Sequence, residues 1–253
     1  MKDPEGLWDK RYSDNPILNA PSEFLAVFEQ YLPSHGTCID IAGGNGRNAL
    51  WFAKRGYATS VIDISSVALN QASKSAESQN VELECIQWDI EKNLLPSERK
   101  WDIALLTLFL NREILKTANQ YLTDNGLLLF AQPTMKNLER HEHPSERFLL
   151  EPSEIFEISK SFSNMEVLHV DEDWRASERH EAWLVCKKKV LTSVTYLRSH
   201  DLFTNCRDSK LDMNWRCMSG QMVNFPVNGT QAAGYIAEAK SGKGTGVLVL
   251  QEG

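Results

Sequence analysis

Apolar runs alternate with segments of helical periodicity over residues 20–189. Five runs have the length and composition of buried parallel strands: residues 37–42, 58–64, 81–90, 101–108 and 126–131. Around them, apolar side chains recur every three or four positions in 21–32, 49–53, 65–72 and 111–122. Strands that alternate with helices form βαβ units, so we predict a mostly parallel sheet with right-handed crossovers.

The chain beyond residue 131 predicts an antiparallel edge for this sheet. Residues 152–161 have a helical pattern, and the runs 165–170 and 182–186 predict two strands joined by a charged turn. Together these elements predict a Rossmann-like α/β fold, a three-layer sandwich with an antiparallel edge strand. The polar segment 134–147 predicts a loop that is long enough to cover a site.

We place the end of this domain at Lys189, so residues 1–189 form one predicted domain. Residues 190–253 break the alternation, because 190–217 has no periodicity and 219–253 has only short strand-like runs. Two or three strands do not build a core of their own. We therefore expect an irregular C-terminal extension and not an independent domain.

Composition narrows the class of protein. The chain has 253 residues and a formal net charge of −7 at pH 7, which argues against nucleic acid as the partner. No stretch approaches the roughly 20 apolar residues of a membrane span, and the N-terminus lacks the apolar core of a signal peptide. We therefore predict a cytoplasmic protein without a membrane partner. The five cysteines are scattered and form no CxxC pair, which predicts reduced thiols and no metal site. Oligomeric state has no signal in the sequence.

The candidate chemistry begins where the first predicted strand ends. Asp40 lies near the end of that strand, and a glycine-rich turn, residues 43–46, leads into a helix. Small residues let the backbone approach a ligand closely, and free N–H groups at a helix start bind anions. The spacing Gly44-x-Gly46-x-x-Ala49 also fits the dinucleotide pattern G-x-G-x-x-G/A. A carboxylate at Asp40, however, would repel a pyrophosphate and suits an ammonium group.

Two further acids stand at the ends of the next two strands. Asp63 comes nineteen positions after Gly44, where an acid can accept both ribose hydroxyls. Asp89 can accept the amino group of an adenine while Ile90 packs on the ring. Aspartates at strand ends also cap turns, which is the alternative interpretation. Since parallel strands end at one edge of the sheet, the three acids fit the amino acid, ribose and adenine of one ligand.

Residues 7–189 resemble the class I S-adenosylmethionine-dependent methyltransferases, and more narrowly the small bacterial branch similar to tellurite-resistance methyltransferases. The matching motifs are Trp8 to Tyr12, Ile39 to Leu50, Val61 to Ser65, Gly126 to Phe130, Asn137 to Arg140 and Phe148 to Leu150. The resemblance implies a seven-stranded sheet in the order 3-2-1-4-5-7-6 and S-adenosylmethionine as the cofactor. Ala42 stands where many of these enzymes carry glycine. Because alanine is small, we expect cofactor binding to persist.

The predicted site has a cofactor part and an acceptor part. The cofactor contacts are Asp40, Ala42, Gly43, Gly44, Gly46, Asn48, Asp63, Ile64, Asp89, Ile90 and Thr107. The candidates on the side of the methyl acceptor are Trp8, Arg11, Tyr12, Arg47, Arg112, Thr134, Arg140 and Arg147. Arginines there suit a small oxyanion or carboxylate, a thiol also stays open, and the simpler interpretation of the loop residues is a solvated surface. Methyl transfer needs alignment and exclusion of water, and no triad or general base is evident.

Three alternatives complete the sequence picture. An NAD(P)-dependent oxidoreductase would use the same glycine turn, but Asp40 and the predicted hairpin argue against it. The second alternative is a non-catalytic nucleoside-binding protein of this fold, and the intact cofactor positions argue against it. Residues 222–253 resemble the truncated N-terminus of a dienelactone hydrolase. The part of that fold that holds the nucleophile is missing, so we infer no hydrolase activity and expect a fusion or frameshift remnant.

Overall fold

The computed structural model describes residues 3–93, 95, 98–162 and 164–190, together with the backbone of 220–227, 230–238 and 245–250. The chain divides into two compact units, Met1–Val190 and Leu191–Gly253. The segment 190–217, for which the sequence shows no periodicity, lies outside the described residues except for Val190.

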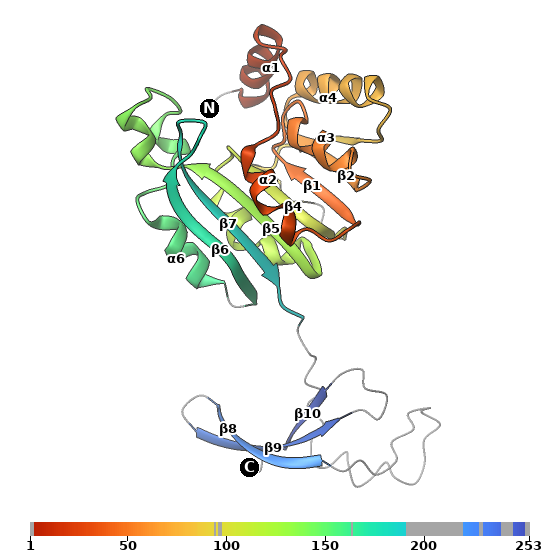
Figure 1. Cartoon of the computed structure of the whole chain (residues 1–253), viewed down its shortest axis with the longest axis vertical. Helices are drawn as coiled ribbons and strands as arrows, with labels where there is room; N and C mark the ends of the chain where they lie inside the picture. Colours follow the sequence, from red (N-terminus) through yellow and green to blue (C-terminus); the bar gives the residue numbers. More distant parts are fainter. Residues whose placement is uncertain are drawn as a thin grey trace. The chain divides into compact units, whose positions relative to one another are not determined.

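A seven-stranded sheet forms the centre of the first unit, in the order β3-β2-β1-β4-β5-β7-β6 (Figure 1). Its strands are β1 (Thr37–Ile41), β2 (Ala58–Asp63), β3 (Glu84–Gln87), β4 (Trp101–Thr107), β5 (Leu122–Pro133), β6 (Met165–Trp174) and β7 (His180–Lys188). The first five pair in parallel, whereas β7 is antiparallel to both β5 and β6. The predicted sheet order and antiparallel edge are confirmed.

Helices cover both faces of the sheet. The α-helices are α1 (Pro4–Asp14), α2 (Glu23–Phe28), α3 (Arg47–Ala53), α4 (Ser66–Ser78), α5 (Arg112–Lys116) and α6 (Glu154–Ser161). Short 3-10 helices are η1 (Glu29–Tyr31), η2 (Ala118–Gln120), η3 (Met135–Glu139) and η4 (Glu146–Phe148). Of the helices in the described residues, none has the length and apolar character to cross a lipid bilayer.

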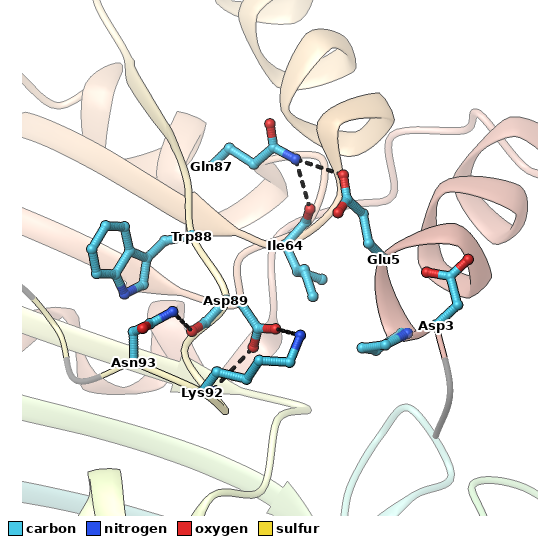
Figure 2. Close-up of a pocket in the computed structure, with 9 residues that line it drawn as sticks. Asp3, Glu5, Ile64, Gln87, Trp88, Asp89, Lys92 and Asn93 are labelled. Carbon is cyan, nitrogen blue, oxygen red and sulfur yellow. Dashed lines mark hydrogen bonds and ion pairs between the residues drawn. The ribbon is translucent and has the colours of Figure 1, made fainter.

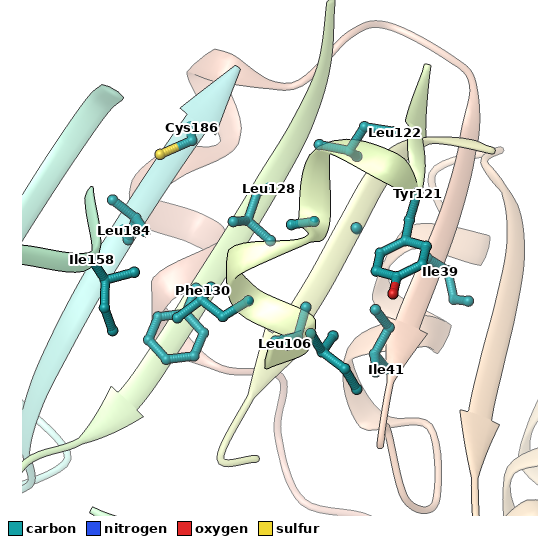
Figure 3. Packing of buried hydrophobic residues seen from close by; sticks show 14 of the residues in the cluster. Ile39, Ile41, Leu106, Tyr121, Leu122, Leu128, Phe130, Ile158, Leu184 and Cys186 are labelled. Carbon is teal, nitrogen blue, oxygen red and sulfur yellow. The ribbon is translucent and has the colours of Figure 1, made fainter. Parts of the chain in front are cut away.

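The two faces of the sheet build separate cores because strand side chains alternate. On one face, Ile39, Ile41 and Leu106 pack with Ile114 of α5 and Ile158 of α6 (Figure 3). The opposite face packs against α2, α3 and α4 through two clusters that contain Phe24, Phe28, Cys38, Phe52, Ile103, Leu105, Ala49, Val61, Leu69 and Ala72. Asp40 belongs to this second face, which places its carboxylate against α3.

Two predicted elements are clearly shorter in the structure, and one helix was not predicted. The helix predicted over 111–122 ends at Lys116, because the Trp101 N–H donates to the Tyr121 carbonyl and Leu122 already pairs with β4. The strand predicted over 81–90 spans only Glu84–Gln87 at the sheet edge. The N-terminal helix α1 was not predicted as a helix, since none of its side chains is buried and it has no apolar face.

The second unit contains a three-stranded antiparallel sheet in the order β10-β9-β8. These strands are β8 (Gly220–Val227), β9 (Thr230–Glu238) and β10 (Thr245–Leu250). The strand-like runs predicted after residue 219 are therefore strands. The resemblance of residues 222–253 to a hydrolase N-terminus stays a prediction.

Candidate functional site

The backbone turns sharply after β1. Ala42, Gly44 and Gly46 have φ values of +54°, +58° and +79°, all in the left-handed region that favours glycine. Ala42 has a side chain there, at a cost of about 1–2 kcal/mol. A Cβ atom on Gly44 would clash with the Tyr12 hydroxyl, so any other residue here would displace the Tyr12 side chain in addition to straining the backbone.

Asp40 lies beneath this turn and has no exposed surface. Its Oδ2 accepts a hydrogen bond from the Ala49 N–H at 3.2 Å, while Oδ1 is buried without a partner among the described residues. Burial raises the pKa of Asp40 to about 7, against the opposing effects of Arg47 and the Ala49 N–H, and Asp63 raises it further. A buried acceptor without a donor is costly. The site is therefore suited to a ligand that brings a cationic donor.

Asp63 fixes the other side of the turn. Its Oδ2 accepts from the Gly44 N–H at 2.8 Å, and its Oδ1 accepts from the Ser65 N–H at 2.9 Å. Burial raises the pKa of Asp63, and these N–H groups oppose the rise. Each carboxylate oxygen has a second lone pair. Asp63 can therefore still accept hydrogen bonds from two neighbouring hydroxyl groups.

A pocket of about 380 Å³, here called the β3-side pocket, opens beside the ends of β2 and β3 (Figure 2). It is lined by Asp3, Pro4, Glu5, Ile64, Gln87, Trp88, Asp89, Lys92 and Asn93. The Asp89 carboxylate pairs with the Lys92 ammonium at 2.6 Å, and this bond lowers the pKa of Asp89. The pocket thus combines apolar surface with one anchored acid.

Ile90 does not take the place expected for it. It is buried in the core beneath the sheet edge and does not line the β3-side pocket. Ile64 and Trp88 supply the apolar surface there instead. The loop after β3 turns at Asp89, where the Glu91 and Lys92 N–H groups donate to Oδ1, and this turn directs Ile90 inward.

Helix α1 contributes to one wall of this pocket, and hydrogen bonds join it to α4, while none of its residues is fully buried. Asp9 accepts from the Ser65 hydroxyl at 2.6 Å and from the Val67 N–H at 3.2 Å, and so caps the start of α4. The Gln71 amide donates to the Tyr12 carbonyl at 2.9 Å. Segments with little buried apolar surface open at low cost in free energy. We therefore expect α1 to open at a lower cost in free energy than the helices that are packed on the sheet.

The predicted acceptor-side residues Trp8, Arg11 and Tyr12 all lie on α1. The Arg11 guanidinium lies 5.1 Å from the Trp8 ring centroid, at the surface. Tyr12 alone reaches the glycine turn, where burial raises its pKa to about 12. Asp9, which sequence reasoning missed, connects α1 to the start of α4. No local pattern in the sequence indicates this contact, because Ser65 already caps α4 through the Ala68 N–H.

A second pocket of about 310 Å³, here called the β7-side pocket, lies at the ends of β4, β5 and β7. Its lining comprises Pro21, Ser22, Glu23, Arg47, Thr107, Leu108, Ala131, Ala176, Ser177, Arg179 and Glu181. Arg47 and Thr107 were predicted, whereas Glu23, Arg179 and Glu181 were missed. An acid at the start of an otherwise apolar strand, as at Glu181, is the signal that could have found this group.

Asn48 was predicted from the sequence to contact the cofactor, but both ends of its side-chain amide are hydrogen-bonded within the protein. Its amide donates to the Thr107 hydroxyl at 2.8 Å, and its carbonyl accepts from the Ser22 N–H at 2.9 Å. These bonds tie the segment before α2 to the end of β4. Asn48 thus connects two residues of the β7-side pocket, Ser22 and Thr107, without lining the pocket itself.

Of the eight predicted acceptor residues, only Arg47 lines either pocket; besides the three on α1, the four described next also lie outside both. Arg112 forms a two-bond ion pair with Glu154, at 2.5 and 2.8 Å. Thr134 is buried, and its hydroxyl lies 2.7 Å from His180 Nδ1. Arg140 stacks on the Trp174 ring, and Arg147 stacks on the Phe148 ring. Within the described residues, no group of three or more His, Cys, Asp or Glu side chains is placed to hold a metal ion.

The sheet order and the glycine turn after β1 define the fold of the class I methyltransferases. Residues 38–126 match the family model of a methyltransferase domain. This segment runs from β1 into β5 and contains Asp40, the glycine turn, Asp63 and Asp89. No match to the chain was found among curated proteins.

Solved structures share this fold at low sequence identity. TehB from Haemophilus influenzae is 19% identical, with a TM-score of 0.55 over 72% of this chain and 67% of that protein. A S-adenosylmethionine-dependent methyltransferase from Clostridium acetobutylicum is 13% identical, with a TM-score of 0.52 over 73% and 97%. The [4+2]-cyclase SpnF is 15% identical, with a TM-score of 0.52 over 66% and 80%. A cyclase among these neighbours shows why function has to be argued from the site.

Proposed function

We propose that this chain is an S-adenosylmethionine-dependent methyltransferase that acts on a small-molecule acceptor. The observation that carries the proposal is the unpartnered, buried Oδ1 of Asp40 beside the glycine turn. The ammonium of the cofactor's amino acid would supply the missing donor. The methyltransferase-domain match over residues 38–126 supports the same assignment.

The rest of the cofactor would extend from Asp40 toward β3. Its ribose hydroxyls would donate to Asp63, and its adenine would enter the β3-side pocket against Ile64 and Trp88. The Lys92 side chain is 70% exposed, so its ammonium can move into water and release Asp89 for the adenine amino group. The acids of three adjacent strand ends then contact three parts of one ligand.

The cofactor brings an activated methyl group on a sulfonium. The protein's residues align it and keep water away. Tyr12 lies against Gly44, and α1 closes one wall of the β3-side pocket, so both would shield the bound cofactor. The β7-side pocket is lined by Arg47, which directly follows the glycine turn, and would receive the acceptor. The resemblance to tellurite-resistance enzymes leaves an oxyanion, a thiol and a carboxylate as acceptor classes.

A nicotinamide dinucleotide fits this site poorly. A pyrophosphate at the start of α3 would lie beside Asp40, whose buried carboxylate repels it. Isothermal titration of the full-length protein with S-adenosylhomocysteine and with NADH separates the two functions. We expect micromolar binding of the first and none of the second, and the reverse result would contradict the proposal.

A pair of aspartate variants sharpens this titration. Asp63→Ala removes the acceptor for the Gly44 and Ser65 N–H groups and for the ribose, and should weaken S-adenosylhomocysteine at least tenfold. Asp124→Ala is the matched control, because the Asp124 side chain is 64% exposed and lies at the far end of the sheet. Equal affinities of the two variants would rule out the ribose role of Asp63.

A further inference from the structure

The β7-side pocket gathers charged side chains of both signs. Arg47 is half-buried, and the nearest hydrogen-bond acceptor of its Nη1 is the Ala20 carbonyl at 3.4 Å. Arg179 is exposed, and its guanidinium has no hydrogen bond or ion pair within the described part of the chain. Both guanidinium groups therefore have donors available for a ligand.

Glu181 brings a carboxylate into the same pocket and is held in a fixed orientation. Only 5% of the residue is exposed, and its Oε2 accepts from the Trp183 indole N–H at 2.9 Å. The Trp183 ring is locked in turn by edge-on contacts with Phe24 and Phe28. Among the described residues, Oε1 of Glu181 has no hydrogen-bond partner, so this oxygen is available to a ligand.

Glu23 and Leu108 also line the β7-side pocket. Oε1 of Glu23 is buried without a partner, which leaves a second acceptor for a ligand's donor. Burial raises the pKa of Glu181, and the negative charge of Glu23 adds to the rise. Leu108 is 41% exposed at the pocket and is held at a φ of +58°, with its N–H donating to the Ala131 carbonyl. The pocket thus offers cations, hydrogen-bond acceptors and an apolar contact.

Resting on the proposed function, we propose that the β7-side pocket binds a small hydroxylated carboxylate and that Glu181 is the base for its hydroxyl group. The ligand's carboxylate meets Arg47 and Arg179, a pairing that guanidinium groups favour. Its hydroxyl donates to Glu181. A pocket of about 310 Å³ is large enough for such a molecule.

The proposed methyl transfer needs no reactant beyond the cofactor, the acceptor and Glu181. The acceptor oxygen attacks the sulfonium methyl carbon, the C–O bond forms, and the C–S bond breaks with its electron pair going to sulfur. The hydroxyl proton passes to the Glu181 carboxylate as the oxygen loses electron density. The products are the methyl ether, S-adenosylhomocysteine and protonated Glu181, which returns its proton to water when the pocket opens.

Three probes test the ligand class. 3-Hydroxybenzoate carries both groups, benzoate lacks the hydroxyl, and phenol lacks the carboxylate. Each is titrated calorimetrically into the full-length protein saturated with S-adenosylhomocysteine. We expect 3-hydroxybenzoate to bind at least tenfold more tightly than phenol, and Arg179→Met to remove most of that difference. Equal affinity for the two, or no binding of 3-hydroxybenzoate at millimolar concentration, overturns the proposal.

The base is tested with labelled S-adenosylmethionine and 3-hydroxybenzoate. Glu181→Gln keeps an acceptor for the Trp183 indole, so the variant should fold and its affinity should change less than threefold. Its kcat for ether formation should fall by about 10²–10⁴-fold. Glu178→Gln, on the exposed turn before β7, is the control and should keep the wild-type rate. A Glu181→Gln rate within threefold of wild type overturns the role of Glu181.

The two proposals fail in different ways. If S-adenosylhomocysteine itself does not bind, the methyltransferase function is wrong. If it binds and none of the three probes does, only the ligand class is wrong. Formation of a benzoate methyl ester that is unaffected by Glu181→Gln would show that the acceptor atom is the carboxylate oxygen and would also overturn the proposal.

Discussion

Replacing Asp40 with asparagine should stabilise the folded protein at alkaline pH while it weakens cofactor binding. Burial raises the pKa of Asp40 from 3.8 to about 7 in the folded protein. Between these values the folded state binds more protons than the unfolded state. The free energy of unfolding therefore falls as pH rises through this window, and asparagine has no charge to contribute to the fall.

The size of the effect follows from the shift. Between pH 5 and pH 7, Asp40 is mostly protonated in the folded state and ionised in the unfolded state. Over these roughly 2 pH units the free energy of unfolding of wild type falls by about 1.4 kcal/mol per unit. The stability of Asp40→Asn relative to wild type should thus rise by about 3 kcal/mol from pH 5 to pH 8. A pH-independent cost of about 1–3 kcal/mol, from an asparagine N–H without an acceptor, cancels in this difference.

Urea unfolding followed by tryptophan fluorescence at pH 5, 6, 7 and 8 measures this difference. The exposed control Asp124→Asn should show little change relative to wild type at any of these pH values. A relative stability of Asp40→Asn that stays flat with pH would refute the reasoning, because the Asp40 carboxylate would then carry no cost of burial.

Three further changes have definite expected outcomes. Gly44→Ala forces a Cβ against the Tyr12 hydroxyl and should raise the Kd of S-adenosylhomocysteine at least tenfold in a calorimetric titration. The control is Gly56→Ala, at φ +84° with open space around it, which should lower stability by about 1 kcal/mol without changing that Kd. Asp9→Asn should speed hydrogen exchange of α1 amides, because it weakens the hydrogen bonds that hold α1 to the start of α4. Unchanged exchange would show that these bonds do not hold α1 in place. A chain ending at Val190 should keep its melting temperature within about 2 °C, since both cores lie within residues 1–190, and a larger drop would show that the second unit supports them.

Most of the fold could be predicted from the sequence because it follows from local patterns. Apolar runs of strand length, separated by helices, specify a parallel sheet, and the charged turn between the last two runs specifies the hairpin. Helix α1 could not be found in this way, since it has no apolar face and its hydrogen-bond partners are distant in the sequence. The helix predicted over 111–122 is longer than α5 because pairing of Leu122 with β4 takes precedence over helical periodicity.

The positions of three aspartates could be predicted because each lies at or near the end of one parallel strand. Asp40 and Asp63 lie at the glycine turn, and Asp89 lines the β3-side pocket, as the topology of parallel strands requires. The β7-side pocket depends on Glu181, which reaches the sheet edge through an antiparallel strand. Sequence spacing does not show that Glu181 lies near the ends of the parallel strands, so the arginines after β4 and β5 were predicted as acceptor residues instead. Of these, Arg112 is paired with Glu154.

A crystal structure of the complex with S-adenosylhomocysteine would show directly whether Asp40 holds the cofactor. We predict that the ligand's ammonium lies within hydrogen-bonding distance of Asp40 Oδ1, its ribose contacts Asp63 and its adenine packs against Ile64 in the β3-side pocket. A ligand bound elsewhere, or an Asp40 carboxylate that stays unpartnered in the complex, would contradict it.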